Sequence, residues 1–209
     1  MGGNLPDRIG NIVILVEDVE QQNLVFRFLE RCDHSITYRR CRFERAAKRS
    51  GGSGEQFVRN QYPAEVKEHR RRVGKGASAL LVVMVDADMQ TTHERALLLS
   101  DALRAAGMDE RRENEPIVVL IPKRHVETWI RALLGDHVDE VKDYTRPTPT
   151  PKEIKDAAAK LHEWTRPSPT QVPRFHFHSL PLSPSGARSR HRLRPRNSNK
   201  PIDKLRRYP

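Results

Sequence analysis

Two aspartates separated by a single residue, Asp86 and Asp88, directly follow a run of seven apolar residues at positions 79–85. Two carboxylates this close repel each other unless a cation lies between them. Carboxylate oxygens are preferred ligands of hard divalent cations. The pattern therefore predicts a site for Mg²⁺ or Mn²⁺. An isolated Asp-x-Asp also fits a solvated turn in which Asp88 caps the next helix, so the choice depends on the other charged residues of the chain.

Charged residues also follow two other apolar runs of strand length, at positions 11–16 and 117–121. If these runs are parallel strands of one sheet, their carboxyl ends meet at one edge and the charged side chains converge there. We predict that five carboxylates at this edge bind the metal: Glu17, Glu20, Asp86, Asp88 and Glu127.

Metal-bound carboxylates suit the cleavage of a phosphodiester, in which the cation activates a water molecule and stabilises the leaving oxygen. For this reaction we expect Glu17 to bind metal or to act as a general acid or base. Lys123 is the candidate for steadying the phosphate, and Arg124 can neutralise phosphate charge beside it. His125 lies in the same segment and could assist, although a surface histidine is the more ordinary interpretation.

Strand-length apolar runs alternate with amphipathic segments four times along the chain. The expected strands cover residues 12–16, 36–43, 79–85 and 117–121, and the expected helices cover residues 20–32, 55–73, 91–106, 124–134 and 152–164. Such an order is typical of an α/β fold with right-handed crossovers. We therefore predict a four-stranded, mainly parallel sheet with helices on both faces, formed by residues 11–165 after a flexible N-terminus at residues 1–10.

The net charge of +11 is concentrated at the C-terminus. Residues 166–209 contain 11 Lys or Arg, one acid, Asp203, and eight of the fifteen prolines. This composition lacks the apolar periodicity of a packed core and predicts a disordered Pro/Arg-rich basic tail. Such a tail could be an arm that binds nucleic acid electrostatically. It could equally be an unselected extension, for example one produced by a change of reading frame near residues 167–173.

Other features narrow the class of protein. No stretch approaches 18 uninterrupted apolar residues, so no membrane-spanning helix is expected. The N-terminal sequence lacks the apolar segment of a secretory signal, which predicts a cytoplasmic protein. Cys32 and Cys41 have no zinc-type spacing, and reduced thiols are expected for both.

A strand that ends in glutamate, followed by a strand that ends in Asp-x-Asp, resembles the topoisomerase–primase (Toprim) domain. Glu17 matches the lone glutamate of that motif, and Asp86 and Asp88 match its paired aspartates. The segment IPKRHVETWI further resembles small bacterial Toprim-like proteins related to the overcoming-lysogenisation-defect nucleases, in which Glu127 would join the metal site.

This resemblance implies a nuclease that uses Mg²⁺ or Mn²⁺ to cleave DNA or RNA. It also implies a role in phage defence, in which a partner ATPase or another defence protein could take part. The resemblance covers about residues 11–164. The chain departs from the family at Asp18, where a glycine is usual.

Two other functions fit parts of the sequence. The first is a non-catalytic module that binds DNA or RNA through the basic tail and the Arg-rich second strand. The candidates for nucleic-acid binding are Arg39, Arg40 and Arg124. The second is a receiver-like phosphoacceptor domain, in which an acid pair binds Mg²⁺ and Asp86 accepts the phosphoryl group. Glu17 and Asp86 are 69 positions apart, which exceeds the spacing that a receiver needs.

Overall fold

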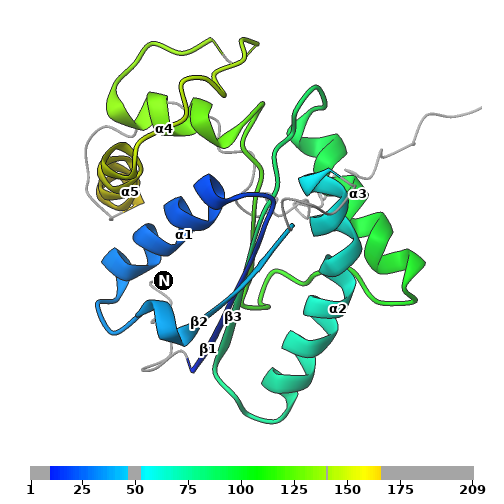
Figure 1. The fold of residues 1–209 in the computed structure, drawn as a ribbon. Coiled ribbons are helices and arrows are strands. Elements are labelled where there is room, and N and C mark those ends of the chain that lie inside the picture. The colour runs from blue at the N-terminus through cyan, green and yellow to red at the C-terminus, as the bar shows by residue number, and fades with distance from the viewer. Residues whose placement is uncertain (1–9, 47–52, 140, 166–209) are drawn as a thin grey trace, which may run out of the picture.

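A computed structural model of the protein describes residues 10–46, 53–139 and 141–165. Its centre is a four-stranded, all-parallel sheet in the order β2-β1-β3-β4 (Figure 1). The strands are β1 (Asn11–Val16), β2 (Cys41–Arg45), β3 (Ala79–Met84) and β4 (Ile117–Leu120). The α/β class and the parallel sheet expected from the sequence are confirmed.

Helices cover both faces of the sheet, as the sequence predicts (Figure 1). One face packs against three of them, α1 (Val19–Cys32), α4 (Val126–Leu134) and α5 (Pro151–Thr165). The other face packs against α2 (Gly54–Gly74) and α3 (Thr92–Ala105).

The alternation of side chains along the strands divides the core in two. In β1, Ile12 and Ile14 join the apolar cluster under α1, α4 and α5, while Val13 and Leu15 join the cluster under α2 and α3. Each such side chain stabilises the fold by roughly 1.5–3 kcal/mol when fully buried. Because β1 and β3 are the two interior strands, the loops that follow them lie side by side in the middle of one sheet edge.

The second strand lies later in the chain than the sequence predicts. A strand was expected at residues 36–43, but β2 begins only at Cys41, because residues 38–40 form a short 3-10 helix, η1 (Tyr38–Arg40). Arg40 contributes to this turn by donating from Nη1 to the carbonyl oxygen of Ser35 at 2.8 Å. Cys41 pairs with Ile12 near the start of β1, so η1 lies at the amino end of the sheet.

The helix after β4 also begins later than expected. It was predicted from residue 124, but α4 starts at Val126 with His125 as its N-cap residue. Lys123, Arg124 and His125 therefore lie in the loop at the carboxyl end of the sheet. The N-cap of α3 is Thr91, which forms a reciprocal capping box with Glu94, so Asp88 does not cap this helix.

The predicted flexible N-terminus at residues 1–10 and the predicted basic tail at residues 166–209 lie outside the described residues, apart from Gly10. Among the helices of the described segments, none is both long enough and apolar enough to cross a bilayer.

Candidate metal centre

The carboxyl ends of β1 and β3 bring Glu17 and Asp86 into contact. The backbone N–H of Asp86 donates to Oε1 of Glu17 at 2.5 Å, although the two residues are 69 positions apart in the chain. Asp86 is 6% exposed, and Glu17 is partly buried. The convergence expected from the parallel sheet therefore occurs for these two residues.

Gln21 connects the same two strand ends. It is fully buried in the first turn of α1. Its Oε1 accepts from the backbone N–H of Glu17 at 3.0 Å, and its Nε2 donates to Oδ1 of Asp86 at 2.9 Å. Asp18, the N-cap of α1, accepts from the backbone N–H of Gln21 at 2.8 Å and so begins the helix that carries this glutamine. Gln21 was not among the site residues predicted from the sequence.

The loop after β3 is joined to the loop after β4. The backbone N–H of Ala87 donates to the Pro122 carbonyl at 2.9 Å, and that of Asp88 donates to the Arg124 carbonyl at 3.0 Å. Both Asp88 (φ 53°) and Arg124 (φ 75°) have left-handed backbones. For residues with a β-carbon this conformation costs roughly 1–2 kcal/mol each. Strain of this kind is often found at functional sites.

Arg95 of α3 forms an ion pair with Asp88. The Arg95 side chain is only 6% exposed, and its Nη2 lies 3.1 Å from Oδ2 of Asp88. Its Nη1 lies 2.9 Å from Oε1 of Glu55, in the first turn of α2. Arg95 thus ties the Asp-x-Asp loop to two helices. This role could not be predicted from the sequence, because an arginine on a helix is most often exposed.

His125 lies beside both aspartates. Its Nδ1 is 3.7 Å from Oδ2 of Asp86 and 3.6 Å from Oδ1 of Asp88, and its side chain is 19% exposed. The contact with Asp86 raises the pKa of His125, with a further contribution from Asp88. The interpretation of His125 as an ordinary surface histidine is therefore wrong.

Burial and mutual repulsion oppose ionisation of the acids at this edge. Burial, reinforced by the charge of Asp86, raises the pKa of Glu17 to about 8. Burial likewise raises the pKa of Glu127 to about 7 and that of Asp18 to about 6. It also raises the pKa of Asp86, which the contacts with His125 and Gln21 partly offset. These acids form one electrostatic cluster that a positive charge would stabilise.

The N-terminus of α2 closes against this cluster. Gly54 is so near the first strand end that a β-carbon there would lie 2.7 Å from Cβ and 3.0 Å from Oε2 of Glu17. No other residue fits this position without displacing the glutamate. The glycine that allows the backbone to approach Glu17 closely thus comes from α2 and not from the position after Glu17, which is Asp18.

Of the remaining predicted site residues, two lie near this edge and two lie at the opposite end of the sheet. Glu20 lies in the first turn of α1, where its charge contributes to the raised pKa of Asp18. Lys123 is exposed in the loop that is hydrogen-bonded to the Asp-x-Asp segment. Arg39 and Arg40 are not brought to this edge, because η1 precedes β2 at the opposite end of the strands.

The carboxylates are close but do not converge on one point. Across residues 10–46, 53–139 and 141–165, no three His, Cys, Asp or Glu side chains are grouped so that they could hold a metal ion. Three of the oxygens already have protein partners, since Glu17 accepts from the Asp86 backbone, Asp86 accepts from Gln21, and Asp88 pairs with Arg95. Because the side chains do not converge as they stand, joint coordination of a cation requires rotation of at least one of them.

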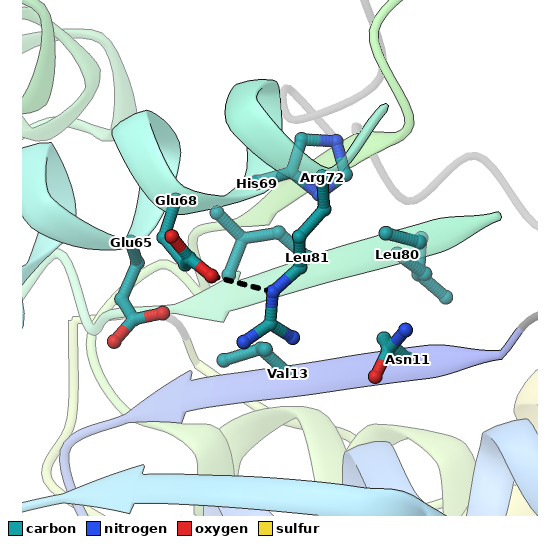
Figure 2. Close-up of a pocket in the computed structure, with 9 residues that line it drawn as sticks. Asn11, Val13, Glu65, Glu68, His69, Arg72, Leu80 and Leu81 are labelled. Carbon is teal, nitrogen blue, oxygen red and sulfur yellow. Dashed lines mark hydrogen bonds and ion pairs between the residues drawn. The ribbon is translucent and has the colours of Figure 1, made fainter. Parts of the chain in front are cut away.

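A surface cavity lies elsewhere, under α2 and beside the first residues of β1 and β3 (Figure 2). It contains none of the predicted site residues. His69 of α2 lines it, is 6% exposed, and has a buried Nε2 with no hydrogen-bond partner in the described part of the chain. The ion pair between Glu68 and Arg72 crosses the same cavity, with Glu68 Oε1 2.7 Å from Arg72 Nε.

Comparison of the chain with protein-family models, with curated proteins and with solved structures gives no significant match. The resemblance to the Toprim domain is therefore still a prediction.

Proposed function

We propose that this protein is a nuclease of the Toprim type that cleaves a phosphodiester of DNA or RNA with Mg²⁺ or Mn²⁺. The observation that carries the proposal is the contact between Glu17 and the backbone of Asp86, next to Asp88 and the buried Glu127. Acids placed together with raised pKa values are typical of functional sites. A role in phage defence, action in the cytoplasm, and a partner ATPase or defence protein belong to the same proposal.

The donor set fits a hard divalent cation. The available ligands are carboxylate oxygens, which suit Mg²⁺ and Mn²⁺. Asp86, Asp88 and Glu17 would hold the metal, and Glu127 and Glu20 would support it. When bound, the metal lowers the pKa of water and stabilises charge on the phosphate.

The side chains of this edge then have separate tasks. Glu17 is either a metal ligand or the general acid or base; for the second role, its pKa of about 8 in the metal-free protein would allow it to take up or release a proton near neutral pH. Lys123 and Arg124 supply positive charge for the phosphate. Gln21 and Arg95 act as positioning residues, because the buried side chain of Gln21 donates to Asp86 and that of Arg95 pairs with Asp88.

A non-catalytic nucleic-acid-binding module is the second candidate. It is favoured by the lack of three convergent metal ligands among the described residues. Such a module would bind through basic side chains, and its affinity would fall steeply with salt. Its binding of nucleic acid would also persist after replacement of the two aspartates, whereas the activity of a metal-dependent nuclease would be lost.

The test is calorimetric titration of the full chain with Mn²⁺ and Mg²⁺, comparing wild type with Asp86→Asn/Asp88→Asn. We expect binding that disappears in this variant. The matched control is Asp109→Asn/Asp136→Asn, which removes two exposed acids away from the sheet edge that carries Glu17, Asp86, Asp88 and Glu127 (the carboxylate edge) and should leave binding intact. Metal-dependent cleavage of DNA and RNA should follow the same pattern. Wild-type protein that binds neither metal would contradict the proposal and favour the binding module.

A further inference from the structure

The ring of Tyr38 is firmly held and yet open to solvent. It stacks on Phe43 of β2 with the ring centroids 4.4 Å apart and 29° between the planes. It also meets Phe26 of α1 edge-on, at a centroid distance of 5.5 Å. Its hydroxyl oxygen accepts from Nε2 of Gln22 at 3.3 Å. Despite these contacts Tyr38 is 56% exposed, and it is the most exposed of the Phe, Trp and Tyr side chains in the described segments.

A held aromatic ring with one open face is suited to stacking on a nucleic-acid base. Every base has a π-face, so such stacking tolerates any sequence. The partners of Tyr38 restrict its rotation before any ligand arrives, which reduces the entropy lost on binding. A base in a duplex is already stacked and paired, so only an unpaired base can use the open face.

The charges around the ring complement a phosphate backbone. Arg39 is exposed directly after Tyr38. The guanidinium carbon of Arg27 lies 5.5 Å from the centroid of Phe26, the ring that contacts Tyr38 edge-on. Arg27 also pairs with Glu30 at 2.9 Å, but the two side chains are 45% and 40% exposed, and a solvent-accessible pair of this kind is weak enough to be exchanged.

The ring is linked to the carboxylate edge through α1. Gln22, which donates to the Tyr38 hydroxyl, follows Gln21, which donates to Asp86. Both glutamines lie near the start of α1. A single-stranded nucleic acid with its reactive phosphate at the carboxylate edge would reach Tyr38 by passing over the N-terminal end of α1.

We propose that Tyr38 is a stacking site for one unpaired base of a single-stranded nucleic acid, with Arg27 and Arg39 neutralising the adjacent phosphates. The inference rests on the proposed function and specifies its substrate as single-stranded. It gives Arg39 a binding role at a position that does not face the metal ligands.

The experiment measures binding of a labelled single strand and of a blunt-ended duplex that contains the same strand, without divalent metal, by fluorescence anisotropy. The full chain carries Asp86→Asn/Asp88→Asn so that no cleavage interferes. Tyr38→Ala should weaken single-strand binding roughly 5- to 150-fold and leave duplex binding unchanged. Tyr38→Phe keeps the stacking face and should stay within about twofold of the parent protein. Tyr144→Ala, which removes an aromatic ring from the loop after α4, serves as the control.

A salt series separates stacking from the basic tail, because the electrostatic contribution of the tail falls with salt while stacking persists. Tyr38→Leu covers Phe43 without offering an aromatic face, so it provides the test if Tyr38→Ala does not fold. Single-strand affinity that is unchanged in these variants, or reduced equally for both substrates, overturns the proposal. Metal calorimetry tests the nuclease independently, so failure of one proposal is distinguishable from failure of the other.

Discussion

Replacement of Glu17 by Gln should make the metal-free protein more stable at alkaline pH. Burial raises the pKa of Glu17 from 4.5 to about 8, so the folded protein holds this proton more tightly than the unfolded chain does. The stabilisation that results is fully present below about pH 4.5 and is lost as the pH rises towards 8. A displacement of this size corresponds to roughly 4–5 kcal/mol, as an order of magnitude. Gln stays neutral throughout and can still accept from the Asp86 backbone.

The assay is urea unfolding in the presence of a chelator at pH 5 and pH 8, since the unfolding free energy can be compared at both values. At pH 5 the Glu17→Gln variant should lie within about 1 kcal/mol of wild type, and at pH 8 it should be more stable by several kcal/mol. Glu30→Gln, in the exposed part of α1, should change neither value by more than about 0.5 kcal/mol. A wild type and a Glu17→Gln variant whose stabilities change in parallel with pH would refute the reasoning.

Three further substitutions test other parts of the structure. Arg95→Ala leaves two carboxylates without their buried partner and should cost roughly 3–5 kcal/mol in urea unfolding, and Arg95→Lys should restore only part of this because its single ammonium cannot reproduce the two-sided guanidinium contact. Gly54→Ala should lower the melting temperature because its β-carbon meets the first strand end at 2.7 Å, whereas Gly74→Ala, in the same helix with no atom within 4 Å, should be neutral or raise it. Burial lowers the pKa of His69, so the contribution of this residue to stability should fall as the pH drops below about 6.5; relative to wild type, His69→Leu should therefore gain stability over this range, and His93→Leu, at an exposed position, should not.

The position of the carboxylate edge followed from the sequence because its signals are local. A buried apolar run that stops at an acid identifies a strand and its end, and the parallel order then places several ends together. Glu17 and Asp86 meet for this reason. The second strand was misplaced because alternation is weak on an exposed, arginine-rich sheet edge. The turn held by Arg40 and Ser35 has no comparably clear pattern.

The supporting residues could not be predicted, because their roles depend on partners far away in the sequence. Gln21 looks like any polar residue of an amphipathic helix until its amide is seen between Glu17 and Asp86. Arg95 has the same difficulty, since its partner Glu55 lies 40 positions away in a different helix. His125 resembles a surface residue because the late start of α4, which leaves it in the loop, is not apparent from hydrophobic spacing.

The carboxylate edge is costly to the stability of this fold, and that cost is itself an argument for function. Buried acids with raised pKa values oppose ionisation, and two residues with left-handed backbones add strain to the adjoining loops. The rest of the sheet gains stability from apolar side chains, and apolar residues at these strand ends would serve that purpose better. Asp86 is instead held in place by Gln21, and Asp88 by the buried Arg95. An arrangement that spends stability to position carboxylates is expected where their charge is used, which is the condition that a bound cation and a phosphate would create.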